Sequence, residues 1–178
     1  GISPDPMKID AISKMKMPTN KKELQRFLGM INYLGKFIPK LSDMTAPLRK
    51  LLQNDVDWSF EKQHEVSVQT LQKLITTAPV LKYFDPTKPT QISSDFSGEG
   101  LGALLEQQID DVWHPVAYAS RTLTPAEHNY SPLEGETLSI VFACEHFHEY
   151  LYGRKFQACN DHQPLRSVFR KPLHKTPP

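Results

Sequence analysis

The sequence predicts an α+β protein in which a small helical unit over residues 1–78 precedes a mixed α/β domain over residues 79–178. Two observations predict this division. Before residue 79 apolar residues recur every three or four positions, as on one face of a helix, whereas after it they alternate with polar residues, as in strands. The later elements also follow the order strand, strand, strand, helix, strand, helix, which is typical of a mixed sheet with flanking helices.

The helical unit is predicted from three amphipathic stretches. The longest covers residues 20–38, where Asn20 and Glu23 can cap the first turn and a proline follows the last turn. Shorter helices are expected over residues 43–52 and 59–77, each with its apolar residues on one side.

The second domain begins with three strands, expected at residues 90–97, 101–108 and 115–121, which can form an antiparallel meander. A fourth strand is expected at residues 156–159, and a short helix near residues 164–169. The glycine-rich turn after the first strand has the spacing of a dinucleotide-binding fingerprint, but it leads into a strand instead of a helix. A hairpin is therefore the better interpretation of this turn.

The long helix between the third and fourth strands has a well-marked beginning. Ser131 is a preferred cap residue, Pro132 occupies the first helical position and Glu134 the third, so that a capping box is expected. The helix is expected to continue to about Tyr150.

Composition limits the functional classes. With 178 residues the chain is too short for a large multidomain enzyme, and with 39% hydrophobic residues it is too apolar for a disordered one. No apolar run approaches the roughly 20 residues needed to cross a bilayer, and the first residues lack a signal-peptide pattern. We therefore expect an intracellular protein without a membrane partner. Cys144 and Cys159 are expected to be reduced thiols, because two cysteines are too few for a disulfide scaffold.

Charge is distributed unevenly along the chain. Residues 1–50 contain 10 Lys and Arg against 4 Asp and Glu, whereas residues 79–178 contain 9 against 12. The first part is suited to face a polyanion and the second to hold cations, although solvated helix faces give similar numbers.

Three acidic residues stand out, because each interrupts or opens an element that is otherwise built for burial. Asp95 ends the first strand of the second domain, Asp161 follows the fourth, and Glu136 lies in the first turns of the long helix. Carboxylates that converge at the ends of elements are costly unless a divalent cation neutralises them, so a hard-metal site is one interpretation. The other is that the two aspartates are turn residues. Glu134 is the weaker candidate on the helix, because its carboxylate is expected to cap the helix.

Seven motifs occur in order along the chain: ELQRFLGMINY (23–33), FIP (37–39), APVL (78–81), SDFS (94–97), HPVAYASR (114–121), EHNYS (127–131) and NDHQPL (160–165). Through these motifs the chain resembles, over its whole length, a segment of the polyprotein of gypsy-type LTR retroelements that runs from the reverse-transcriptase thumb into the RNase H domain. SDFS stands where that family usually has Thr-Asp-Ala-Ser.

The resemblance implies a thumb-like helical unit, an RNase H-like domain, and catalytic and metal-binding roles for Asp95, Glu136 and Asp161. In that family two Mg²⁺ or Mn²⁺ ions support cleavage of the RNA strand of an RNA–DNA hybrid. The implied partners are an RNA–DNA hybrid or another nucleic-acid duplex and the fingers and palm of the reverse transcriptase. The implied location is the cytoplasm or a virus-like particle.

Three departures from the family pattern qualify these expectations. Phe96 replaces a small residue and Asn160 a threonine, both next to implied ligands. The family usually has a fourth aspartate near its C-terminal end, yet residues 162–178 contain no acidic residue. We therefore expect an RNase H-like domain that lacks its C-terminal part and holds the second metal ion less firmly. The alternative is a catalytically inactive or domesticated module that binds nucleic acid or protein. Polymerase activity is not expected, because fingers and palm are absent from the sequence.

Overall fold

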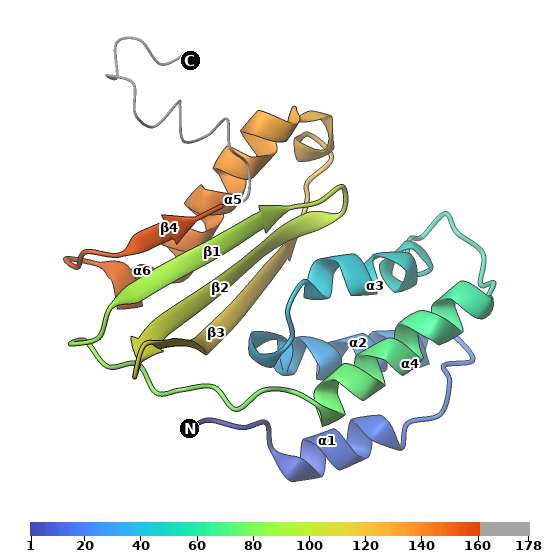
Figure 1. Cartoon of the computed structure of the whole chain (residues 1–178). Helices are drawn as coiled ribbons and strands as arrows, with labels where there is room; N and C mark the ends of the chain where they lie inside the picture. Colours follow the sequence, from blue (N-terminus) through green and yellow to red (C-terminus); the bar gives the residue numbers. More distant parts are fainter. Residues whose placement is uncertain (161–178) are drawn as a thin grey trace.

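The structure, a computed structural model, describes residues 1–160; the short helix expected near residues 164–169 lies outside this part. The described part is layered around one four-stranded sheet (Figure 1). Helices α5 (Pro132–His146) and α6 (His148–Leu151) lie on one side of the sheet, and the helices of the N-terminal part lie on the other. None of the helices within residues 1–160 combines the length and the apolar character that crossing a membrane requires.

The N-terminal helices share one apolar core. Their bounds are α1 (Pro6–Ser13), α2 (Lys21–Tyr33), the 3-10 turn η1 (Gly35–Phe37), α3 (Leu41–Lys50) and α4 (Lys62–Thr76). The predicted cap of α2 is confirmed, since the Asn20 side chain accepts a hydrogen bond from the backbone N–H of Glu23. The helix predicted over residues 20–38 ends earlier, because the chain tightens into η1 before Pro39.

Helix α1 is missing from the sequence prediction. Ile12 is its one fully buried residue, so it has no apolar stripe for a periodicity analysis to detect. Its signals are local: the Asp5 side chain caps the helix, and Pro6 occupies the first position. The side chain of Gln72 on α4 then holds the end of α1, by donating hydrogen bonds to the carbonyls of Ile12 at 2.9 Å and Met15 at 3.0 Å.

The sheet has the strand order β3-β2-β1-β4. The strands are β1 (Thr90–Phe96), β2 (Gly100–Ile109), β3 (Val112–Thr122) and β4 (Gln157–Cys159). The predicted antiparallel meander of β1, β2 and β3 is confirmed, and the short β4 pairs parallel to β1. Pro115 lies in the edge strand β3, next to a shift of register, where its missing N–H disturbs the ladder least.

Helix α5 begins as the sequence predicts. The Glu134 carboxylate accepts the Ser131 backbone N–H at 2.8 Å, and the Ser131 hydroxyl oxygen accepts the Glu134 N–H at 3.4 Å, which completes the capping box. The single helix expected to Tyr150 is instead divided at Phe147 into α5 and α6. Phe147 itself is buried, together with Ala143, in the core between α5 and the sheet.

Helix α3 approaches the other face of the sheet very closely. A Cβ on Gly100 of β2 would lie 2.5 Å from the Cβ of Ser42 and 2.8 Å from the carbonyl oxygen of Arg121, so the approach requires glycine. Beside this point the backbone N–H of Ser42 donates to the Ser120 hydroxyl at 2.8 Å, and the two hydroxyls form a short hydrogen bond. Only the small side chains of Ser42 and Ser120 therefore separate the start of the helix from the sheet at this point.

Two further polar contacts join α3 to the turn between β1 and β2. The Ser97 hydroxyl donates a short hydrogen bond to the Asp43 carboxylate, and Lys50 forms an ion pair of 3.0 Å with Glu99. The Lys50–Glu99 pair is well exposed, so we regard it as fixing orientation more than adding stability, whereas Asp43 is half-buried.

We predict that Gly100→Ala lowers the free energy of unfolding by about 1–3 kcal/mol, because the added methyl group must displace α3 or the β3 backbone. Urea denaturation would measure the change. Gly102→Ala on the same strand is the matched control, since its Cβ would meet nothing nearer than the Lys40 Cγ at 3.8 Å. Equal losses in both variants would contradict the close approach.

A second prediction concerns the ion pair at the end of β3. Arg121 donates two hydrogen bonds of 2.9 Å to Glu127, one to each carboxylate oxygen, and the backbone N–H of Thr124 donates a third at 2.7 Å. These bonds, that from Arg121 foremost, lower the pKa of Glu127 from 4.5 to about 2. A lowered pKa in the folded state gives stability that is complete above about pH 4.5 and is lost as the pH falls toward 2.

We therefore expect Glu127→Gln to be less stable than the parent protein by about 1 kcal/mol at neutral pH, with a difference that shrinks as the pH falls from 4.5 toward 2. Urea denaturation at several pH values would measure it. A difference that stays constant over this range would show that the charge of Glu127 is not the stabilising feature.

Candidate active site

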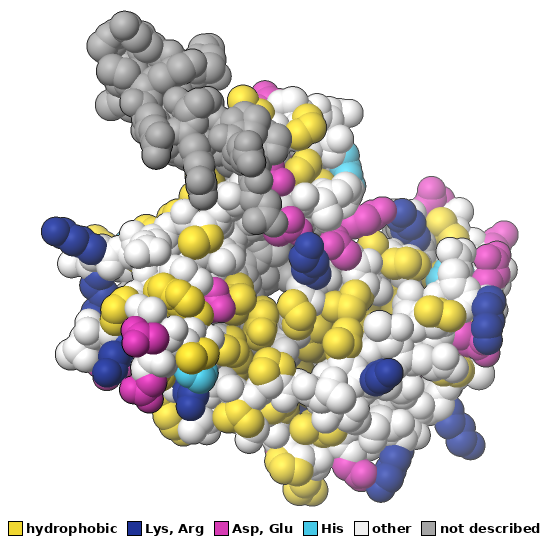
Figure 2. Space-filling view, viewed as in Figure 1, with side chains coloured by type: hydrophobic (Ala, Val, Ile, Leu, Met, Phe, Trp, Pro, Cys, Tyr) yellow, Lys and Arg dark blue, Asp and Glu magenta, His cyan; other side chains and the backbone are white. Residues whose placement is uncertain are grey.

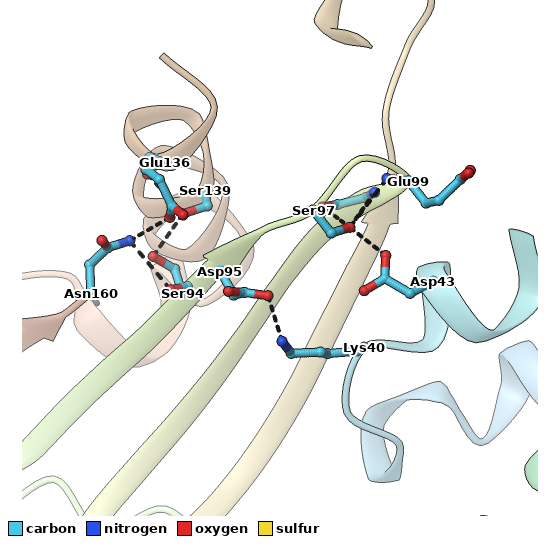
Figure 3. Close-up of polar contacts among 10 residues, drawn as sticks. Lys40, Asp43, Ser94, Asp95, Ser97, Glu99, Glu136, Ser139 and Asn160 are labelled. Atoms are coloured by element: carbon cyan, nitrogen blue, oxygen red, sulfur yellow. Dashed lines mark hydrogen bonds and ion pairs between the residues drawn. The ribbon is translucent and has the colours of Figure 1, made fainter. Parts of the chain in front are cut away.

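Asp95 lies near the end of β1, on the face of the sheet that carries α3. Side chains alternate along a strand, and the preceding Ser94 points to the opposite face, where it accepts a hydrogen bond of 2.9 Å from Ser139 of α5. The Asp95 carboxylate forms an ion pair of 2.7 Å with Lys40, whose backbone immediately precedes α3 (Figure 3). With 42% of its side chain exposed, Asp95 is accessible to solvent.

Glu136 reaches the same end of β1 from α5. Its carboxylate accepts a hydrogen bond of 2.8 Å from the side-chain amide of Asn160, and the same amide lies 3.4 Å from the carbonyl oxygen of Ser94 (Figure 3). Asn160 follows β4 directly, so these bonds connect α5, β1 and the end of β4. The Glu136 carboxylate is thus held near the ends of the parallel strands β1 and β4.

The turn of α5 that carries Glu136 lies close to β1 because of a glycine. A Cβ on Gly135 would come within 2.4 Å of the ring of Phe96, so the ring occupies the space that a side chain would need. Phe96 is the residue that departs from the family pattern beside the implied ligand Asp95. In the structure its ring packs toward α5, away from the face to which Asp95 points.

Asp161, the third candidate from the sequence, lies outside the described residues; it is the residue next after Asn160. Within residues 1–160 the structure contains no cluster of three or more His, Cys, Asp or Glu side chains that could hold a metal ion. The described donors are the carboxylates of Asp95 and Glu136, whose oxygen atoms are the type that Mg²⁺ and Mn²⁺ prefer. Their chemistry fits such ions, and a three-carboxylate set requires Asp161.

Glu134, the neighbouring acidic residue, has a different environment. Its carboxylate caps α5, and the hydrogen bond from the Ser131 hydroxyl, followed by that from the Ser131 backbone, holds the pKa of Glu134 below its usual range. The capping role that separated Glu134 from Glu136 in the sequence is therefore present in the structure.

A pocket of about 270 Å³ opens beside the ion pair of Lys40 and Asp95. Tyr118 of β3 is one of its lining residues, and burial, followed by the nearby charge of Glu106, raises the pKa of the Tyr118 phenol. Asn160 and Cys159 also line the pocket. Cys159 is a free thiol, as the sequence predicts, but it is exposed, whereas its apolar neighbours in the sequence favour a core position. It gives solvent and small ions access to the Asp95 carboxylate.

Lys40, Ser94 and Ser139 are site residues that the sequence does not predict, and Asn160 is visible there only as a departure from the family pattern. No local signal identifies Lys40, because its contact with Asp95 joins a loop of the helical part to a strand of the sheet. The pair of Ser94 and Ser139 is likewise a contact between two separate elements.

Comparisons with known proteins agree with this architecture. Residues 60–158 match the family described as the RNase H-like domain found in reverse transcriptase. The Transposon Tf2-3 and Tf2-4 polyproteins of Schizosaccharomyces pombe are each 37% identical over 168 residues, which cover 93% of this chain and 13% of theirs. The chain thus spans about an eighth of the length of these relatives.

Solved structures show the same fold. A foamy viral protease-reverse transcriptase dRH in complex with ds DNA superimposes with a TM-score of 0.78 at 20% identity, over 99% of this chain and 31% of that one. A foamy viral protease-reverse transcriptase in complex with an RNA/DNA hybrid gives a TM-score of 0.74 at 21% identity, over 98% and 24%.

The family match includes α4, strands β1 to β3, α5, which carries Glu136, and all of β4 except Cys159. With the retrotransposon relatives, it establishes that this chain belongs to the family of RNase H-like domains found in reverse transcriptase.

Proposed function

We propose that this chain is the part of a retroelement reverse transcriptase that cleaves the RNA strand of RNA–DNA hybrids in a metal-dependent reaction. The observation that carries the proposal is the position of Glu136, which is hydrogen-bonded to the residue preceding Asp161 at the end of β1 where Asp95 lies. Family membership supplies the reaction class, and these carboxylates supply the chemistry.

In this proposal Asp95, Glu136 and Asp161 hold two Mg²⁺ or Mn²⁺ ions, which would activate water and stabilise the leaving 3′ oxygen. Asn160 is a positioning residue: its amide donates to one oxygen of Glu136, which orients the carboxylate and leaves the other oxygen for a cation. The hydrogen bond between Ser94 and Ser139 holds the strand and helix in register beneath it.

The proposed partner is an RNA–DNA hybrid or another nucleic-acid duplex, beside the fingers and palm of the same polyprotein. Two of the structural relatives are complexes with ds DNA and with an RNA/DNA hybrid. We propose that residues 1–78 act as a thumb-like unit and residues 79–178 as the RNase H-like domain. On the face drawn in Figure 2, apolar side chains gather in the middle, and basic side chains interspersed with acidic ones lie toward the rim. We propose that the basic ones contact phosphates. We place this activity in the cytoplasm or in a virus-like particle.

The alternative function is binding of nucleic acid or protein without cleavage. It is favoured by the partners that the two described carboxylates already have, namely the Lys40 ammonium for Asp95 and the Asn160 amide for Glu136. A protein that has lost its metal ions could retain such contacts as purely structural ones.

We predict that the chain cleaves a labelled RNA strand in a hybrid with Mn²⁺, and that Glu136→Gln reduces the rate at least about 100-fold, since changes even in residues supporting metal ligands cost about 10- to 100-fold. The matched control is Glu134→Gln, because glutamine can also complete a capping box and the helix start is preserved. This control should retain the parent rate.

Similar losses in both glutamine variants would mean that the helix start, and not a metal ligand, is required. Absence of cleavage by the parent chain, together with hybrid binding that survives Glu136→Gln, would support the alternative. Asp95→Asn provides an independent variant, from the strand side of the site.

A further inference from the structure

Lys40 has an unusual backbone conformation at the point where the helical part meets the sheet. Its φ of 49° and ψ of 37° lie in the left-handed region, which side chains other than glycine, asparagine and aspartate rarely adopt. Its carbonyl accepts the first hydrogen bonds of α3, from Asp43 at 3.2 Å and Met44 at 3.4 Å. A lysine held in a strained conformation next to a candidate site suggests a function for its side chain.

The surroundings of Lys40 direct its ammonium group to Asp95. The aliphatic stem passes beside Gly102 of β2, and a Cβ there would lie 3.8 Å from the Lys40 Cγ, at ordinary van der Waals distance. The adjoining Ser42 is fixed to the sheet by its bonds to Ser120. The ammonium therefore reaches Asp95 at 2.7 Å from an anchored backbone.

The ion pair borders an open space. Lys40 and Asp95 both line the pocket of about 270 Å³, together with Ser93 and Asn160. This volume is sufficient for a cation with several waters, and for the ammonium group to move aside within it.

We propose that Lys40 is a tethered counter-ion which competes with a divalent cation for the Asp95 carboxylate. The inference rests on the proposed function, in which Asp95 is a metal ligand. Without a divalent ion the ammonium balances the charge of Asp95; when the ion binds, it displaces the ammonium, because the two positive charges repel each other at such short range. Lys40 thus weakens metal binding, and couples it to the loop that begins α3.

The chain contains a close match for this ion pair. Lys50, the last residue of α3, pairs with Glu99 at 3.0 Å, and the side-chain exposures of 64% and 41% resemble the 58% and 42% of Lys40 and Asp95. Neutralising either lysine removes one positive charge from an end of α3, but of the two only Lys40 contacts a candidate ligand. Comparing the two neutralised variants therefore separates the loss of a competing ammonium group at Asp95 from a general change in net charge.

The test is a titration of the metal-free 178-residue chain with Mn²⁺, in which electron paramagnetic resonance measures the free ion. We expect Lys40→Gln to bind Mn²⁺ roughly three- to tenfold more tightly than the parent, from the loss of an exposed ion pair and of charge repulsion. Lys50→Gln should change the affinity less than about twofold. Lys40→Arg, which keeps the charge, should bind like the parent.

Asp95→Asn shows whether Mn²⁺ binding, and the effect of Lys40→Gln on it, depend on the Asp95 carboxylate. It should weaken Mn²⁺ binding, and should remove most of the gain seen in Lys40→Gln when the two changes are combined. If Mn²⁺ binding depends on Asp95 but Lys40→Gln binds no more tightly than Lys50→Gln, the counter-ion role is refuted and the proposed metal site remains. If no variant shows binding that depends on Asp95, the proposed metal site is refuted, and the counter-ion role with it.

Discussion

The close approach of α3 to the sheet at Gly100 is the constraint on which the geometry of the candidate site depends. Because this residue has no side chain, Ser42 can bond directly to Ser120, and the helix starts at a fixed height above β2. The loop before the helix then brings Lys40 to Asp95. A larger residue at position 100 would move α3 outward together with Lys40. It would thereby alter the electrostatic environment of Asp95 without contacting Asp95 itself.

The candidate carboxylates Asp95 and Glu136 have different partners, because side chains alternate between the two faces of β1. Ser94 faces α5, whereas Asp95 faces the loop before α3. Glu136 approaches from the helix layer, and is oriented by Asn160 at the end of β4. Each carboxylate therefore has a partner from a different layer of the fold, and a change in the packing of one layer leaves the other carboxylate with its own partner.

Sequence analysis succeeded where the determinants are local. The change of apolar period gave the strands and their meander, and the Ser131 cap with Glu134 gave the start of α5, because these features depend on residues a few positions apart. Helix α1 was missed since a single buried residue carries no period. The partners of the candidate site residues were missed for another reason: Lys40 meets Asp95 only through the folding of α3 onto the sheet, which no sequence spacing encodes.

The uneven distribution of charged residues along the chain allows its two parts to form ion pairs with each other, which a count of charged residues in the sequence does not reveal. Lys40 and Lys50, from the basic first part, form ion pairs with Asp95 and Glu99, from the acidic second part. Part of the positive excess is therefore engaged in intramolecular ion pairs where α3 meets the sheet. The excess overstates the charge available to a polyanion, because each of these exposed lysines is paired with a carboxylate, and displacement of Lys40 from Asp95 by a cation would leave one more unpaired positive charge on the surface beside the candidate site.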